Sequence, residues 1–236
     1  MDASAQSQPP DMTELESQLN TGSEKTQLQV MPDILAQGTA GYSILQNFLL
    51  SRQQQTSTYI DGRCYELLLG TEVSDVQAFL EEHFATGVVP LRSEQNIDYL
   101  PLQRLLAKQS FQEADDLTLS KLCELSGPAA VKRKWIYFTE VEQYPIADLQ
   151  TINQLWLVHS EGKFGYSVQR QLWLSVGRNW DALWPKINWR SGRNWTRWPD
   201  EFTWDLSAPR GHLPLSNQLR GVQVLNALLS HPAWTS

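Results

Sequence analysis

Apolar residues in the first third of the chain recur at helical spacing between short polar turns. Val76, Leu80 and Phe84, for example, lie four positions apart, which places their side chains on one face of a helix. This region lacks the sustained alternation of apolar and polar residues that is typical of strands. We therefore predict that residues 11–86 form a bundle of four or five helices.

Capping and breaking residues divide this region into separate helices. Thr13 and Glu16 have the spacing of a capping box, and Ser23 is expected to cap the next helix. Pro32 is expected to interrupt that helix, because proline lacks the N–H that an interior position donates. Residues 1–10 are polar and contain two adjacent prolines, and we predict that they form a disordered tail.

The remainder of the chain is also predicted to be helical. A linker over 87–96 leads into a second domain over 97–236, in which helical patterns are separated by turns rich in Gly and Ser. Asp148 is expected to cap one of these helices, and the last helix is expected to begin after Pro214 and to reach Ser230. The predicted fold class is therefore all-α, an N-terminal helical bundle followed by an all-helical domain.

Charge and tryptophan content separate the two halves of the chain. The net charge of the chain is −7. Residues 1–120 contain 17 acidic and 6 basic residues, whereas residues 121–236 contain 9 acidic and 13 basic residues. All 10 tryptophans lie at or beyond Trp135. Arginines and tryptophans are interleaved most densely over 162–199. We expect this window to offer a surface for a planar, anionic partner.

The sequence contains none of the common catalytic or metal-binding patterns. It lacks a phosphate-binding loop, a dinucleotide fingerprint and a zinc-protease motif, and its four histidines lack metal-ligand spacing. Asp115 and Asp116 project about 100° apart on a helix, so we interpret them as a solvated face. Cys64 and Cys123 are expected to be reduced and buried. We therefore predict a protein that is not an enzyme and holds no metal ion.

The sequence also bears on location. No apolar run approaches the ~18 residues of a membrane-spanning helix, and the first residues lack the basic and apolar regions of a leader peptide. The expected location is the cytoplasm, with peripheral association with membranes left open.

The tryptophans are not expected to share one role. Trp156 and Trp173 fall within helical apolar patterns and are assigned to the core. Trp189, Trp195 and Trp198 lie in a polar, turn-rich stretch beside arginines, where no helical face would bury them. Such rings either pack on a groove or hold a ligand. Two ligands fit: a single-stranded nucleic acid, which needs stacking rings and a track of cations, and a planar apolar molecule with a few carboxylates, such as a porphyrin.

The last predicted helix supplies a candidate cation for such carboxylates. Asn217 and Arg220 lie three positions apart, opposite an apolar stripe that includes Leu215 and Leu229. An amide and a guanidinium would therefore project side by side. An exposed Asn and Arg without a ligand is the alternative interpretation, and the spacing by itself leaves both open.

Several short motifs in the second half of the chain are similar to those of one known family. They occur at 99–102, 114–115, 148–152, 155–156, 165–169, 204–209 and 211–214. Together they resemble the tetrapyrrole-binding family named for the fourth genomes-uncoupled locus of plants, the accessory proteins of magnesium chelatase. The resemblance covers about 97–236, and the preceding helical bundle resembles the cyanobacterial form.

The resemblance implies both a fold and a function. The fold would be an all-helical core shaped like a cupped hand. The ligand would be protoporphyrin IX or magnesium protoporphyrin IX, bound without a covalent link. The partner would be the porphyrin-binding subunit of magnesium chelatase, which a monomeric, non-catalytic carrier would stimulate at the first committed step towards chlorophyll in photosynthesis. The alternative is a single-stranded nucleic-acid-binding module; under the porphyrin hypothesis no nucleic acid is a partner.

The resemblance also implies site residues. The groove would be formed by the 187–205 loop and the 111–138 region. The expected ring contacts are Phe138, Trp189, Trp195 and Trp198, with Arg220 on a propionate and Asn217 nearby, towards the metal through water. Tyr166 stands where many relatives have phenylalanine, and its additional hydroxyl needs a hydrogen-bonding partner.

Overall fold

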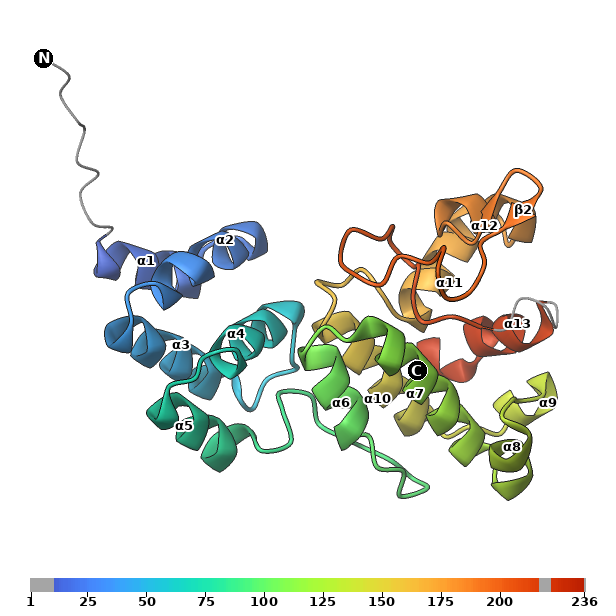
Figure 1. The fold of residues 1–236 in the computed structure, drawn as a ribbon, viewed down its shortest axis with the longest axis horizontal. Coiled ribbons are helices and arrows are strands. Elements are labelled where there is room, and N and C mark those ends of the chain that lie inside the picture. The colour runs from blue at the N-terminus through green and yellow to red at the C-terminus, as the bar shows by residue number, and fades with distance from the viewer. Residues whose placement is uncertain (1–10, 217–221, 236) are drawn as a thin grey trace, which may run out of the picture. The chain divides into compact units, whose positions relative to one another are not determined.

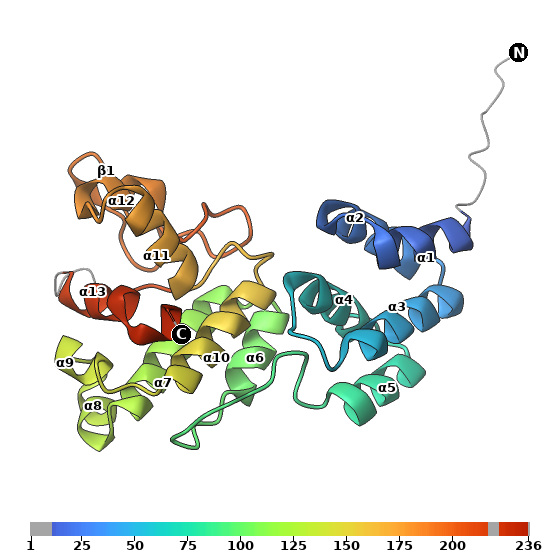
Figure 2. The same ribbon diagram turned by 180° about the vertical axis from the view of Figure 1, so that it is seen from behind.

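Short helices joined by tight turns make up almost all of the regular structure (Figures 1 and 2). The computed structural model describes residues 11–216 and 222–235 of the chain. The chain divides into two compact units, residues 1–85 and residues 86–236. Both units are helical, and the only strands among the described residues are two residues long. The predicted all-α fold class is confirmed.

Over residues 11–85, the described part of the first unit, the chain forms five helices. They are α1 (Met12–Thr21), α2 (Glu24–Leu35), α3 (Thr39–Arg52), α4 (Tyr59–Leu69) and α5 (Ser74–Phe84). Ser23 caps α2 as predicted, but Asp11 rather than Thr13 caps α1, its carboxylate accepting the Thr13 N–H at 2.9 Å. The expected break at Pro32 is also wrong, because α2 continues through it. Burial of the neighbouring Met31 outweighs the one hydrogen bond that proline removes.

Helices α2 and α3 approach closely at Gly41. A Cβ atom at this position would lie 1.8 Å from the Ile34 carbonyl oxygen, a backbone atom that cannot rotate away. We therefore expect Gly41→Ala to lower the free energy of unfolding by about 1–3 kcal/mol, measured by urea denaturation. Gly70→Ala is the control, since its Cβ would meet its nearest neighbour, the Glu66 carbonyl oxygen, at 3.4 Å. Equal stability of the two variants would contradict the close approach.

The second unit contains the remaining described elements. They are α6 (Leu100–Ala107), α7 (Phe111–Leu125), α8 (Pro128–Arg133), α9 (Phe138–Val141), α10 (Ile146–Val158), α11 (Tyr166–Ser175), α12 (Trp180–Lys186), β1 (Arg190–Ser191), β2 (Asn194–Trp195), α13 (Gln223–Ser230) and the 3₁₀ helix η2 (Pro232–Trp234). Strands β1 and β2 form an antiparallel hairpin. Leu215 and Ser216, which were expected to lie in the last helix, are not helical. The Leu215 N–H donates instead to Asp115 on α7.

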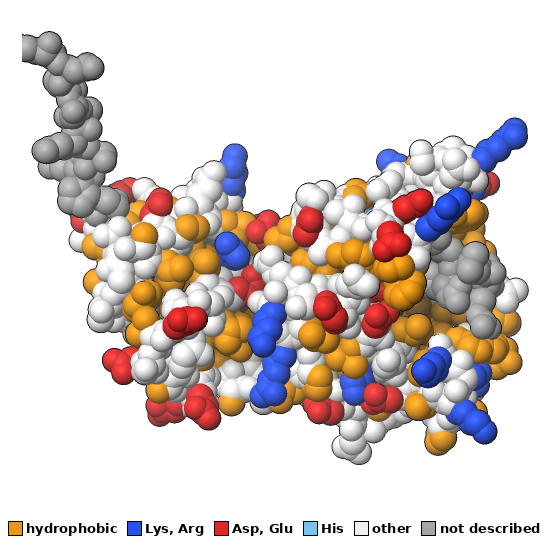
Figure 3. All heavy atoms as spheres, viewed as in Figure 1, with side chains coloured by type: hydrophobic (Ala, Val, Ile, Leu, Met, Phe, Trp, Pro, Cys, Tyr) orange, Lys and Arg blue, Asp and Glu red, His pale blue; other side chains and the backbone are white. Residues whose placement is uncertain are grey.

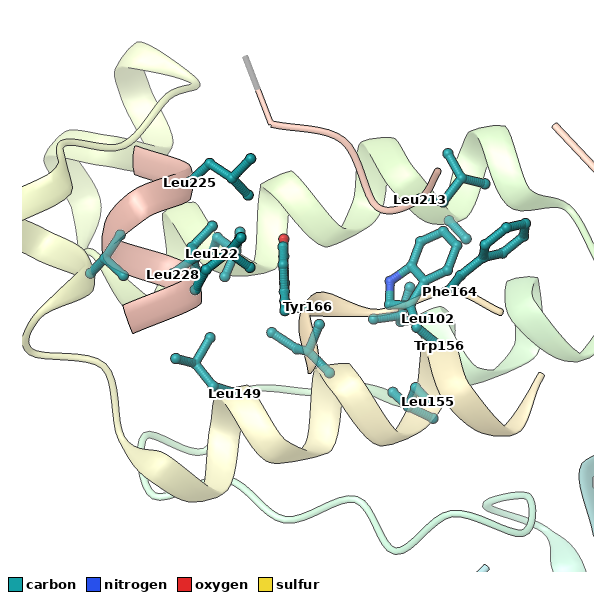
Figure 4. Packing of buried hydrophobic residues seen from close by; sticks show 14 of the residues in the cluster. Leu102, Leu122, Leu149, Leu155, Trp156, Phe164, Tyr166, Leu213, Leu225 and Leu228 are labelled. Atoms are coloured by element: carbon teal, nitrogen blue, oxygen red, sulfur yellow. The ribbon is translucent and has the colours of Figure 1, made fainter. Parts of the chain in front are cut away.

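Aromatic rings form the centre of the second unit between α7 and α10. Trp156 is fully buried and stacks on Phe111 with ring centroids 6.0 Å apart. Its indole N–H donates to the Thr118 hydroxyl at 3.0 Å. Figure 4 shows Trp156 beside Phe164, whose ring it meets edge-on. The assignment of Trp156 and Trp173 to the core is confirmed, because helical periodicity identifies a buried face.

The segment that leads into α6 is fixed to the second unit by buried polar side chains. The Gln103 amide accepts the Val89 N–H at 2.9 Å and donates to the Thr86 carbonyl. Asp148 accepts the Tyr99 hydroxyl at 2.8 Å and the Glu94 N–H at 2.9 Å. Asp148 is therefore not the helix cap predicted from sequence: α10 begins after Pro145, and Asp148 is fully buried within it.

The structure also tests the expectations for the two cysteines and for membrane-spanning helices. Cys64 and Cys123 are buried and unpaired, as predicted. Within 11–216 and 222–235, no helix has the length and hydropathy needed to cross a bilayer.

Candidate functional site

A cavity of about 530 Å³ lies between α9 and α13, which are neighbours in both ribbon views (Figures 1 and 2). Its volume falls within the ~300–1,000 Å³ that is usual for small-molecule pockets. The lining residues are Phe138, Glu142, Gln223, Asn226, Ala227, Ser230, His231 and Pro232. Phe138, one of the expected ring contacts, is 38% exposed. This cavity is the candidate site.

The spacing of residues on α13 explains why this helix forms one wall of the cavity. Leu225, Leu228 and Leu229 are buried in the core. Gln223, Asn226, Ala227 and Ser230 recur at the three- and four-residue spacing of a single helical face. One face of α13 thus packs on the core while the other offers small and amide side chains to the cavity.

Phe138 of α9 and Glu142, directly after this helix, form the opposite wall. Arg133 holds the loop that leads from α8 into α9. The Arg133 guanidinium forms an ion pair with Glu140 and lies over the Trp135 ring at 4.9 Å and the Tyr137 ring at 4.6 Å. Glu140 also accepts the Tyr137 N–H at 2.7 Å. These contacts fix the loop and leave Phe138 exposed. Figure 3 shows Lys and Arg side chains around α8, beside apolar ones.

The tryptophans of 173–189 pack on one another rather than around an open space. Trp173 stacks on Trp180 with ring centroids 4.9 Å apart, Trp180 on Trp184 at 5.2 Å, and Trp184 on Trp189 at 5.7 Å. Trp189 is fully buried, and its indole N–H donates to the His212 carbonyl at 2.8 Å. The expectation that no surface would bury the loop tryptophans is therefore wrong for Trp189. A ring with 0% exposure offers no face to a ligand.

Trp195 and Trp198 differ from this stack because they remain exposed. They are 40% and 57% exposed, and Trp195 meets Trp184 in a T-shaped arrangement with ring centroids 5.5 Å apart. Arg190 lies over Trp195 at 5.5 Å and pairs with Asp181 at 2.8 Å. These two indoles remain available as ring contacts.

Residues 211–215 are fastened to the helical core along their length. Gln169 on α11 donates to the carbonyls of Gly211, at 3.1 Å, and Pro214, at 2.7 Å. Asp115 accepts the Leu215 N–H at 2.6 Å. The interpretation of Asp115 as a solvated residue is wrong: it is 7% exposed, and burial raises its pKa to about 7. Periodicity could not reveal this, because the partner lies 100 residues away.

Two expected ligand contacts, Asn217 and Arg220, lie outside the described residues. Of the others, the structure brings Phe138 to the cavity and leaves Trp195 and Trp198 exposed near the hairpin. Glu142 and Asn226 were not predicted as cavity residues. The apolar and polar spacing of α13 could have indicated Asn226, whereas nothing in the local sequence marks Glu142.

The described residues form no cluster that could hold a metal ion. Within 11–216 and 222–235, no group of three or more His, Cys, Asp and Glu side chains could hold a metal ion. His212 is buried, bonded to the Ile187 carbonyl at 2.6 Å and accepting the Thr203 N–H at 3.2 Å. Burial lowers its pKa, so it is neutral and already partnered.

Comparisons with known proteins agree with this architecture. Residues 92–232 match the family described as GUN4-like, and residues 3–85 match the ARM-like repeat domain described as GUN4-N terminal. A Ycf53-like protein of Synechocystis sp. is 50% identical over 225 residues, 95% of this chain and 97% of that protein. The chloroplastic tetrapyrrole-binding protein of Arabidopsis thaliana is 44% identical over 144 residues, 57% of this chain and 54% of that protein.

Solved structures that match part of this chain include two GUN4 proteins. GUN4 from Chlamydomonas reinhardtii aligns with a TM-score of 0.59 and 44% identity, covering 63% of this chain and 95% of that one. Ligand-free GUN4 from Arabidopsis thaliana aligns with a TM-score of 0.55 and 44% identity, covering 59% of this chain and 99% of that one. The family match spans more than half of the chain, and the chain accordingly belongs to the GUN4-like family, with an ARM-like GUN4-N terminal domain preceding its GUN4-like domain.

Proposed function

We propose that this protein binds a tetrapyrrole, without a covalent link, at the cavity between α9 and α13. The observation that carries the proposal is this cavity, which has an exposed Phe138 on its wall. The chain is also 44% identical to a chloroplastic tetrapyrrole-binding protein. The proposed ligands are protoporphyrin IX and its magnesium complex.

The expected energetics are those of a flat apolar ligand with charged edges. Burying ~300 Å² of apolar ligand surface gives about 7 kcal/mol, and association costs at least ~4 kcal/mol. Tight binding therefore needs hydrogen bonds to the carboxylates, each contributing about 1.5–3 kcal/mol. In our proposal Arg220 supplies one of these hydrogen bonds, with Asn217 nearby. Trp195 and Trp198 cover the face of the tetrapyrrole ring.

We further propose a carrier role. The protein would act as a monomer in the cytoplasm, deliver porphyrin to the porphyrin-binding subunit of magnesium chelatase and stimulate that enzyme without catalysing a step itself. The test is the initial rate of magnesium insertion by purified chelatase, with and without this protein. An unchanged rate at saturating protein would reject the activator role and leave porphyrin binding standing.

Protoporphyrin IX is expected to quench the tryptophan emission in a saturable, one-to-one titration, because exposed and half-exposed indoles lie in the same unit as the cavity. The titration should be repeated from low to high salt. Affinity that responds weakly to salt fits a ligand held by burial. A steep fall with salt would indicate phosphate-like contacts and favour the nucleic-acid alternative.

Phe138→Ala is expected to weaken protoporphyrin binding by about 1–2 kcal/mol, roughly 5- to 30-fold in Kd, because it removes an apolar wall of the cavity. Tyr137→Ala is the matched control. Tyr137 is the adjacent residue, is 49% exposed and does not line the cavity. Equal loss in the two variants would place the ligand elsewhere.

A further inference from the structure

Arg133, at the end of α8, is enclosed by the segment that follows it. Its guanidinium lies over the Trp135 and Tyr137 rings, and these two rings meet edge to face with centroids 4.4 Å apart. Its Nε atom donates to the Trp135 carbonyl at 2.8 Å, and its Nη2 atom forms the ion pair with Glu140. One carbonyl, one carboxylate and two rings thus engage a side chain that is only 20% exposed.

The carboxylate that pairs with Arg133 also holds the start of α9. Glu140 accepts the N–H of Tyr137, the N-cap residue of this helix, at 2.7 Å. Helix α9 has only four residues, and a helix this short is not stable without outside contacts. The position of α9 therefore depends on the contacts that tie it to the rest of the unit, and Arg133 provides one set of them.

Phe138 lies between the two anchors of α9. It is the first residue of the helix, directly after Tyr137, and it lines the cavity. The other anchor is Val141, which is fully buried at the end of the helix. Truncation of Val141 would open a cavity in the core, whereas Arg133 can be changed at its partly exposed end. Arg133 is thus the residue through which the position of Phe138 can be tested.

A direct contact with a ligand is the competing role for Arg133. This residue is not among those that line the cavity. To reach a carboxylate of a bound ligand, the guanidinium would have to leave Glu140, and the separation of a partly buried ion pair costs free energy. The geometry therefore favours a role through neighbouring residues.

We propose that Arg133 is a positioning residue for the tetrapyrrole site, a proposal that rests on the proposed function: through Glu140 and the two rings, it keeps α9 where Phe138 forms a wall of the cavity. Without Arg133, α9 samples other positions, and fewer molecules have the wall in place. The measured Kd rises by the inverse of the fraction that is competent to bind.

The first test measures the protoporphyrin IX Kd of Arg133→Met by tryptophan quenching. Binding should weaken about 3- to 10-fold, and by no more than in Phe138→Ala, because Arg133 contributes only by placing that ring. Lys132→Met is the matched control, since Lys132 is the preceding residue, is exposed, and carries the same charge. It should bind like the wild type. Equal weakening in the two lysine and arginine variants would mean that net charge sets the affinity, and would overturn the proposal.

The second test combines Arg133→Met with Phe138→Ala. If Arg133 acts through Phe138, the double variant should bind as weakly as Phe138→Ala and no more weakly, because the two changes remove the same contribution. If Arg133 instead contacts the ligand, or if its loss loosens the whole unit, the two losses in affinity should multiply. Multiplied losses would overturn the proposal.

The third test needs no ligand and separates this proposal from the proposed function. The Tyr137 N–H is bonded to Glu140, so its hydrogen exchange, followed by NMR, reports whether the start of α9 is held. Its protection factor should fall at least about 3-fold in Arg133→Met and stay unchanged in Lys132→Met. An unchanged protection factor in Arg133→Met would defeat the role of Arg133, whether or not porphyrin binds. Absence of porphyrin binding by the wild type, with the fall in protection observed, would defeat the proposed function instead.

Discussion

Trp189→Ala is expected to lower the free energy of unfolding by about 3–5 kcal/mol, the usual range for truncating a buried tryptophan. The indole is fully buried and stacked on Trp184 at 5.7 Å. Its removal would leave a cavity in the core and take away the donor that the His212 carbonyl accepts at 2.8 Å. Chemical denaturation followed by far-ultraviolet circular dichroism measures the loss.

Trp198→Ala is the matched comparison. Trp198 lies nine positions later in the same turn-rich stretch, but it is 57% exposed. Its truncation should change stability by no more than about 0.5 kcal/mol, and under the proposed function it should weaken protoporphyrin binding. Near-wild-type stability of Trp189→Ala would show that Trp189 is not a core residue and would return it to the candidate ligand contacts.

The contribution of Asp115 to the free energy of unfolding is expected to decrease as the pH rises from about 4 to about 7. Burial raises the pKa of this group from 3.8 to about 7 in the folded protein. Between these values the folded state binds more protons than the unfolded state, so raising the pH favours unfolding. Each unit of pKa difference between the folded and unfolded states changes the free energy of unfolding by about 1.4 kcal/mol. The full rise from 3.8 to about 7 therefore corresponds to about 4 kcal/mol.

Asp115→Asn should remove this contribution. Its neutral amide can still accept the Leu215 N–H, so the variant should match the wild type near pH 4 and be more stable at pH 8. Urea denaturation across this range, with Asp116→Asn as the variant that keeps the wild-type profile, measures the difference. A variant less stable than the wild type at pH 8 would mean that the ionised Asp115 carboxylate stabilises the fold.

The helical periodicity was sufficient to predict most of the helices but not all of their ends. Val76, Leu80 and Phe84 are buried on one face of α5, as their spacing indicates. Caps were less predictable, because Thr13 competes with Asp11 two positions earlier, and the Asp11 carboxylate is the one that is bonded. Pro32 shows that the burial of neighbouring side chains can override a breaker.

The candidate site was only partly accessible from the sequence. Phe138 was predicted through a family resemblance and does line the cavity. Trp189 and Trp198 look alike in sequence, because both lie in turns beside arginines. They differ in the structure because α12 and the His212 carbonyl provide a buried surface for Trp189, and no local pattern encodes that surface.

The sequence by itself determined the all-helical class, the change in composition between the halves and the absence of the common catalytic motifs, since each is a property of nearby residues or of counts. Only the tertiary structure decided which polar groups are buried. Asp115 and Asp148 have the local surroundings of solvated or capping residues. Each is removed from water by a partner far along the chain: Leu215 for Asp115, and Tyr99 with Glu94 for Asp148. Desolvation depends on every atom around a group in space, and the chain order does not specify those atoms.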